Sequence, residues 1–196
     1  MVIGYHIILT GYGHWLPNDP RGSMSHDVFS PDLMPLAEHH FGRRKIQPSK
    51  KMLRTFFVEA QQYLTHSILW WEEAERRAIT QAFREIIHEQ KLTCYSCAIL
   101  PNHVHLLMRK HRIPAEEMSD AMKERACTLL GKIEFADKKH PIFSDRRCHV
   151  YKSDVPSMRN CVRYIEFNCG KHKLPRQKYD FVTPYDDWPL HNKQRS

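Results

Sequence analysis

Two strand-like segments separated by only two residues constrain the fold of this chain more than any other feature. They cover 91–100 and 103–109, with Pro101 and Asn102 between them. Both segments have the composition of β-strands, and two residues leave room only for a tight reverse turn. We therefore expect an antiparallel hairpin, around which the rest of the fold must be arranged.

Strand and helix patterns flank this hairpin in a regular order. A first strand is expected at Tyr5 to Thr10, and apolar residues at three- and four-residue steps predict one helix before the hairpin and one after Pro114. A strand near 148–151 and a helix from Asp154 to Gly170 follow. This order is the split βαβ pattern of an α+β, ferredoxin-like antiparallel sheet. We expect helices on one face of the sheet and an appended C-terminal helix.

The length of the chain bounds its domain organisation. A chain of 196 residues is long enough for one sizeable core and short for two independent domains, so we predict a single domain over 1–196. The segment 14–51 is rich in Pro, Gly, Asp and Ser without a lasting period, which indicates a long loop excursion from the core. The segment 171–196 is interpreted as a basic tail.

The charge of the chain favours a polyanionic partner. The formal net charge is +8 and the isoelectric point is about 9.2, which attracts nucleic acid without regard to sequence. The basic residues expected to contact DNA are Arg43, Arg44, Lys45, Arg146, Arg147, Lys171 and Lys173. The tryptophans are further candidates for stacking on unpaired bases, although buried core aromatics are the commoner use.

No sequence feature indicates a membrane or secreted protein. No apolar run approaches the roughly 20 residues of a membrane span, and the N-terminal residues do not resemble a secretion signal. The six cysteines are then expected to be reduced thiols. We expect a cytoplasmic location.

Two histidines in the hairpin are candidate metal ligands. His103 and His105 are two residues apart on a predicted strand, so both side chains point to the same face, away from Val104. Two imidazoles that converge in this way can hold a metal ion. The alternative is a pair of hydrogen-bonded surface histidines.

The C-terminal helix carries a second group of reactive side chains. At 3.6 residues per turn, Tyr164, Asn168 and Lys171 form a row along its flank, beside an apolar stripe. On an isolated helix this row would be ordinary boundary residues. Next to a metal it gains a chemical use, because a phenol with a pKa near ~10 attacks an anionic phosphate poorly without a cation. Neutral ligands would leave the positive charge of that cation uncancelled.

These residues resemble those of the HUH single-tyrosine transposases, of the insertion-sequence 200 type and the REP-associated tyrosine transposases. His103-Val104-His105 matches their His-hydrophobic-His motif, and Tyr164 with Asn168 matches their Tyr-x-x-x-Asn or Gln segment. The opening segment 12–23 is also similar to REP-associated members, and the resemblance covers nearly the whole chain.

The resemblance implies a function. It implies a metal-dependent single-stranded DNA endonuclease and strand transferase that acts at hairpin-forming repeats, as a monomer or a homodimer. Mg²⁺ or Mn²⁺ would bind His103, His105 and Asn168, and Tyr164 would form a 5′-phosphotyrosine link while leaving a free 3′-hydroxyl. One departure is Cys169, since family members often have proline after the asparagine.

Two other interpretations stay open. Cys94 and Cys97 could form a structural zinc site with His103 and His105, although cysteines three apart on a strand without a bulge face opposite sides. Alternatively, the chain is a catalytically inactive DNA-binding protein derived from a transposase, in which the basic segments contact phosphates.

Overall fold

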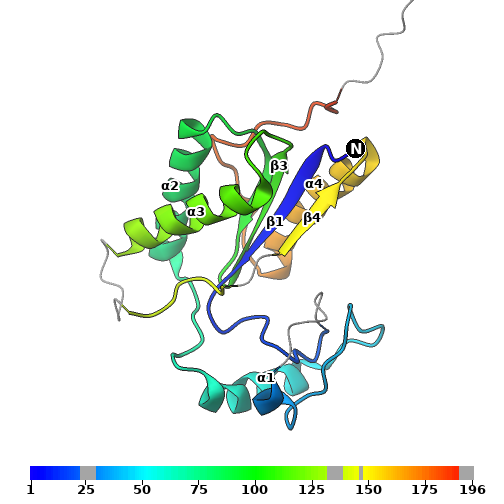
Figure 1. The fold of residues 1–196 in the computed structure, drawn as a ribbon, viewed down its shortest axis with the longest axis vertical. Coiled ribbons are helices and arrows are strands. Elements are labelled where there is room, and N and C mark those ends of the chain that lie inside the picture. Colours follow the sequence, from blue (N-terminus) through cyan, green and yellow to red (C-terminus); the bar gives the residue numbers. More distant parts are fainter. Residues whose placement is uncertain (23–29, 132–138, 146–147, 190–196) are drawn as a thin grey trace, which may run out of the picture. The chain divides into compact units, whose positions relative to one another are not determined.

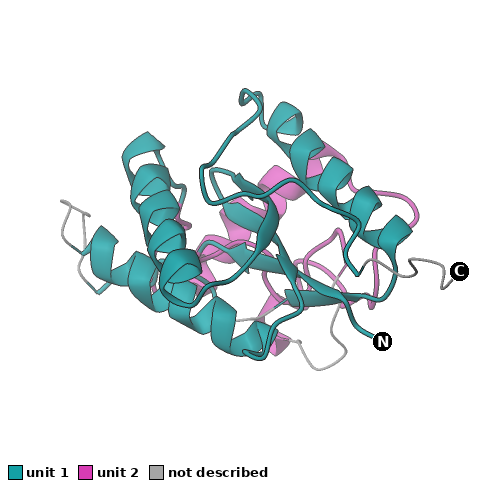
Figure 2. Cartoon of the chain, turned by 90° about the horizontal axis from the view of Figure 1, so that it is seen from above, with its two compact units in different colours: residues 1–11, 70–196 teal, residues 12–69 magenta. Residues whose placement is uncertain are grey.

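The chain forms two compact units in the computed structural model, which describes residues 1–22, 30–131, 139–145 and 148–189. Unit 1 comprises residues 1–11 and 70–196, and unit 2 comprises residues 12–69 (Figure 2). The excursion predicted over 14–51 therefore falls within unit 2.

Unit 1 is built on a four-stranded sheet in the order β2-β3-β1-β4 (Figure 1). The strands are β1 (Gly4–Thr10), β2 (Cys94–Ile99), β3 (His103–Arg109) and β4 (Cys148–Lys152). Every neighbouring pair is antiparallel. The predicted hairpin joins β2 to β3, and the Leu100 N–H donates to the His103 carbonyl at 2.9 Å across its turn. The ferredoxin-like, split βαβ arrangement predicted from the sequence is confirmed.

Helices cover both faces of this sheet. α2 (Glu73–Glu89) and α3 (Ala115–Leu130) pack against each other on one face, and α4 (Val155–Lys171) lies on the other (Figures 1 and 2). The strand register fixes which side chains meet which helix, because residues directly opposite in an antiparallel pair point to the same face. Ile7 lies opposite Leu106, whereas Ile8 lies opposite His105. The histidines therefore point toward the face of α4.

The start and the apolar stripe of α4 explain its position. An Asp154 carboxylate oxygen accepts from the Ser157 N–H at 2.7 Å and caps the first turn. The stripe packs on the sheet in one core of buried residues: Ile3, Tyr95, Ala98, Leu100, Leu107, Met158, Cys161, Ile165 and Cys169. The helix continues one residue beyond Gly170, its predicted last position, and His172 caps it. The flank with Tyr164 is thereby held over the strands.

The segment after α4 runs along the outer edge of β2. The Gln177 side-chain amide donates to the Ile99 carbonyl and accepts from the Ile99 N–H, each at 2.8 Å. The Thr183 N–H donates to the Cys94 carbonyl at 2.8 Å. These contacts cover backbone groups that an edge strand would otherwise expose. Most of the predicted basic tail is thus packed on the sheet, and its residues 190–196 lie outside the described part of the chain.

Unit 2 has its own small core. It contains α1 (Lys50–Ala60) and two short 3₁₀ helices, η1 (Pro31–Leu33) and η2 (Gln61–Tyr63). The buried residues of this core are Leu16, Leu33, Phe56 and Ala60. The Leu69 N–H donates to the Tyr12 carbonyl at 3.1 Å and joins the two ends of the unit. Among the helices that the structure describes, none has both the length and the apolar character that crossing a membrane requires.

Candidate metal and nucleophile site

The two predicted histidine ligands meet on the α4 face of the sheet. His103 and His105 are buried, with 9% and 3% of their surface exposed. Their Nε2 atoms are 3.1 Å apart, and their ring centroids are 4.7 Å apart. Two imidazole nitrogens at about 2.0–2.1 Å from one ion have a comparable separation. The pair therefore fits a shared metal ion.

Outer hydrogen bonds orient both rings. His103 Nδ1 donates to Asn102 Oδ1 at 2.7 Å, and His105 Nδ1 lies 3.0 Å from His6 Nε2. When the protons of both rings are on Nδ1, the two facing Nε2 atoms present lone pairs to the same point. Such lone pairs repel each other unless a cation lies between them. The chemistry of this donor set suits a divalent ion.

Burial keeps the imidazoles of His105 and His6 neutral. It lowers the pKa of His105 to about 2, with further contributions from His103, His6, Lys171 and His172. Burial and the charge of Lys152 lower the pKa of His6 to about 4. The neutral ring is the form that binds a metal ion. Both rings are therefore ready to act as a ligand or as a hydrogen-bond acceptor at neutral pH.

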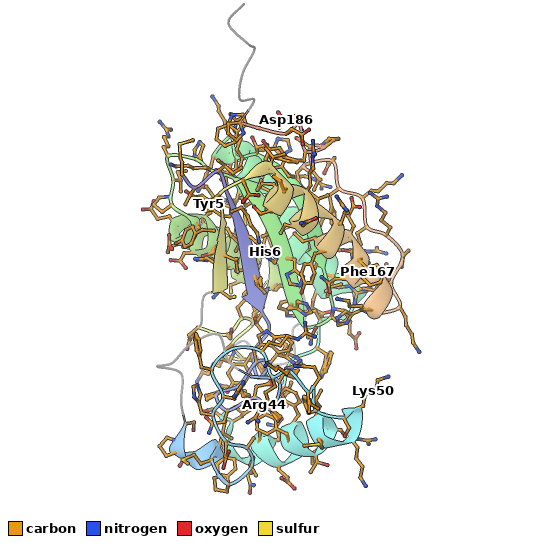
Figure 3. The ribbon with its side chains drawn as sticks, turned by 90° about the vertical axis from the view of Figure 1, so that its right-hand side faces the viewer. Tyr5, His6, Arg44, Lys50, Phe167 and Asp186 are labelled. Atoms are coloured by element: carbon orange, nitrogen blue, oxygen red, sulfur yellow. The ribbon has the colours of Figure 1, made fainter. Side chains whose placement is uncertain are left out.

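Tyr164 lies beside this histidine cluster and is open to solvent. Its ring centroid is 5.4 Å from that of His105 and 5.9 Å from that of His6. It is 46% exposed, so an external molecule can reach it. The view in Figure 3 shows His6 on its strand and Phe167, on the same helix as Tyr164, toward the C-terminal end of that helix. The structure thus places the ring of Tyr164 beside His105, one of the two predicted histidine ligands.

Asn168 and Lys171 continue the row from Tyr164. The buried Asn168 amide donates from Nδ2 to the Tyr164 carbonyl at 2.9 Å, and its Oδ1 accepts from Lys171 Nζ at 3.2 Å. Lys171 Nζ also lies 5.0 Å from the centroid of the Tyr164 ring. Asn168 Oδ1 has a second lone pair for a further contact.

A metal ion at this cluster would be held by fewer than three His, Cys, Asp or Glu side chains of the described residues. Within the described residues, no group of three or more His, Cys, Asp or Glu side chains is placed to hold a metal. A metal on His103 and His105 would therefore need oxygen ligands of another kind. The side-chain oxygen of Asn168 and water are the chemically suitable ones.

The other predicted DNA contacts belong to different parts of the chain. Lys173 is exposed just beyond α4, with a left-handed backbone at φ +57°. Arg43, Arg44 and Lys45 belong to unit 2, where an Arg44 guanidinium nitrogen donates to the Glu38 carbonyl at 3.4 Å. Arg146 and Arg147 lie outside the described residues.

The structure excludes the zinc site built from Cys94, Cys97, His103 and His105. A bulge in β2 puts Cys94 opposite Met108 and Cys97 opposite Leu106. The two cysteines would face opposite sides only on a strand without a bulge, and the bulge in β2 inserts one extra residue that brings them to the same side. Their shared face is the one of Leu106, on the side of the sheet away from His105. Burial raises the pKa of the Cys94 thiol to about 12, so this thiol is a core group.

Three residues of the cluster were missed by the sequence interpretation. His6 and Asn102 orient the histidine pair, and the ring of His172 lies 5.4 Å from that of His103. His172 is four residues beyond Asn168, so the helical period could have added it to the row. No pattern marks His6, because its contact with His105 depends on the strand register.

Comparisons with known proteins give distant structural similarity only. No family model matches the chain, and neither does any curated protein. One similar structure is a REP-associated tyrosine transposase bound to a REP hairpin, with 11% identity, a TM-score of 0.47, and coverage of 89% of this chain and 70% of that one. Another, from Deinococcus radiodurans and described as a candidate transposase, has 11% identity, a TM-score of 0.40, and coverage of 85% and 90%. With TM-scores below 0.5, these similarities carry no argument about family or activity.

Proposed function

We propose that this protein is a transposase-type enzyme that cuts and rejoins single-stranded DNA through a covalent link to Tyr164. The observation that supports this most strongly is the position of the exposed Tyr164 ring, 5.4 Å from the ring of His105. A phenol is a weak nucleophile toward phosphodiesters, and a cation-binding pair of imidazoles beside it supplies what it lacks.

The residues of the site have separate roles in this reaction. His103 and His105 would hold Mg²⁺ or Mn²⁺, with Asn168 as the third ligand. The bound ion would stabilise the negative charge that develops on the phosphoryl oxygens. Lys171, 5.0 Å from the Tyr164 ring, contributes a positive charge near the position of the phosphate.

The covalent step exchanges one phosphate ester for another. The Tyr164 phenol oxygen forms a bond to phosphorus and loses its proton to solvent. The bond from phosphorus to the 3′ oxygen breaks, and this oxygen takes up a proton to give a free 3′-hydroxyl and a 5′-phosphotyrosine. Rejoining is the reverse reaction with a 3′-hydroxyl as nucleophile.

The substrate is expected to be single-stranded DNA or a hairpin with a single-stranded flank. The tyrosine lies on the flank of a helix that is fixed on the sheet, so the phosphate must be turned until its leaving oxygen is in line with the attack. A flexible strand can adopt this geometry, whereas a duplex resists it.

A cleavage assay with matched tyrosine variants tests the proposal. A labelled hairpin with single-stranded flanks is incubated with wild type, Tyr164→Phe and Tyr151→Phe. Tyr151 is a suitable control because it is also exposed, at 53%. We expect cleavage by wild type and Tyr151→Phe in Mg²⁺ or Mn²⁺, no cleavage by Tyr164→Phe, and no cleavage by any of the three in excess EDTA.

DNA binding by Tyr164→Phe should persist, because only the attacking oxygen is removed. Binding without any cleavage by wild type would favour the alternative of an inactive DNA-binding protein. Cleavage by Tyr164→Phe, or full activity in EDTA, would contradict the proposal.

A further inference from the structure

A basic cavity lies in unit 1 at the opposite end of β3 from the histidine pair. Its volume is about 520 Å³, and its lining includes Lys91, Arg109, Lys110, Arg112 and Trp188. Arg109 is four residues beyond His105, which at ~3.4 Å per residue of an antiparallel strand is about 14 Å. The cavity is therefore separate from the site of Tyr164. Asp186, close to Trp188 in sequence, and Phe167, near the C-terminal end of α4, lie toward opposite ends of unit 1 in Figure 3.

Within the described part of the chain, no ion pair neutralises the positive charges of this cavity. Among the ion pairs of the described residues, none joins Lys91, Arg109, Lys110 or Arg112 to a carboxylate. Lys91, Lys110 and Arg112 are exposed. Four cations around one hollow repel each other, so the cavity favours an anion.

Two of the three acidic residues close in sequence to the cavity are paired with arginines outside its lining. The two Glu89 carboxylate oxygens accept from Arg125 at 2.8 and 2.9 Å. Asp186 accepts from the Tyr95 hydroxyl at 3.1 Å and from the Trp188 N–H at 3.2 Å. Asp187 accepts from Arg159. Arginines outside the cavity thus pair with Glu89 and Asp187. Asp186 accepts from two neutral donors, so its single negative charge remains beside the four cations.

Trp188 gives the cavity an aromatic wall and holds one of its cations. The Arg109 guanidinium carbon lies 3.9 Å from the centroid of the Trp188 ring. A guanidinium stacked on a ring in this way keeps its N–H groups at the edge for an oxyanion. An indole is also a surface on which a base or a sugar can pack.

We infer that this cavity binds the sugar-phosphate backbone of a DNA strand at a distance from the position of Tyr164. The inference rests on the proposed function in so far as the bound strand belongs to the substrate. Cations distributed over Lys91 and the successive residues 109–112 suit several consecutive phosphates better than one isolated anion. With roughly 3.4 Å per phosphate along a duplex strand, the separation of about 14 Å from His105 corresponds to about four base pairs. The stem of a hairpin could fill this interval.

The test compares two variants that lose the same charge. Lys110→Gln with Arg112→Gln removes two cations from the cavity. Arg77→Gln with Lys139→Gln removes two exposed cations elsewhere in unit 1. Fluorescence anisotropy measures the affinity of each for a hairpin with a single-stranded flank over a series of salt concentrations. Each phosphate contact contributes about 0.7 to 0.9 to the slope of log K against log salt.

We expect the cavity variant to bind about 10-fold more weakly at low salt, with a slope smaller by about 1.4 to 1.8, and the control variant to match wild type. Equal slopes for all three proteins would overturn the inference.

The same proteins separate this inference from the proposed function. A short single-stranded oligonucleotide that reaches only the Tyr164 site should be cut by the cavity variant as fast as by wild type. If no DNA is cut by wild type but the salt slope falls in the cavity variant, the inference stands and the proposed function fails. If DNA is cut but the slopes are equal, the reverse holds.

Discussion

The two faces of the unit 1 sheet are built from different chemistry. On the α2 and α3 face, the central strands present side chains such as Ile7, Leu9, Val104 and Leu106, all fully buried and apolar. On the α4 face, apolar packing around Leu107 gives way to His6, His103 and His105. The same strand contributes apolar side chains to one face and histidines to the other, because successive side chains point to opposite faces of the sheet. The comparison teaches that one face stabilises the fold and the other is available for chemistry.

The largest effect is expected from removing the histidine pair. His103→Ala with His105→Ala deletes both imidazole ligands. The affinity for Mn²⁺ should therefore fall by about 1000-fold or more. Calorimetric titration of Mn²⁺ measures this. His88→Ala, at an exposed position of α2, is the control. Undiminished Mn²⁺ binding by the double variant would remove the basis for assigning chemistry to the α4 face.

A large effect of another kind is expected on the apolar face. Leu9→Ala leaves a cavity under α2 and α3 and should lower the free energy of unfolding by about 2–5 kcal/mol, while Mn²⁺ affinity below the unfolding transition stays unchanged. Urea denaturation followed by circular dichroism measures the loss. Val150→Ala, at a position that is 38% exposed, should cost much less. A fall in Mn²⁺ affinity in folded Leu9→Ala would show that the two faces are not separable.

A smaller effect is expected from His6, which acts through His105. His6→Phe keeps a ring of similar size but removes the nitrogen that lies 3.0 Å from His105 Nδ1, so the affinity for Mn²⁺ should fall by about 10- to 100-fold. His6→Gln offers a side-chain oxygen as acceptor and should recover part of the loss. Equal affinities for His6→Phe and wild type would leave His6 as a packing residue only.

The sequence predicts the elements of this site better than it predicts their contacts. A two-residue turn allows one topology, so β3 and the common face of His103 and His105 are predictable. The helix α4 is also predictable, because Asp154 marks its start and the apolar stripe marks the side that packs on the sheet. The contact of His6 depends on the register of β1 against β3, which local patterns do not contain.

Two other features also depend on contacts between distant parts of the chain and could not be predicted from local sequence patterns. The bulge in β2 that brings Cys94 and Cys97 to one face has no glycine to mark it. The membership of α1 in a separate unit depends on tertiary packing around Phe56. The local sequence pattern predicted which residues could react. The pairing of distant segments determines which of these residues contact each other.

The most direct measurement of the proposed chemistry is the identity of the residue that becomes attached to DNA. Wild type is incubated with a hairpin substrate in Mn²⁺, the mixture is digested with protease and nuclease, and the modified peptide is weighed and fragmented by mass spectrometry. The expected result is a single nucleotide-bearing peptide with the added mass on Tyr164, attached through a 5′-phosphate. Attachment to any other residue, or cleavage with no covalent adduct, would contradict the assignment of Tyr164 as the nucleophile.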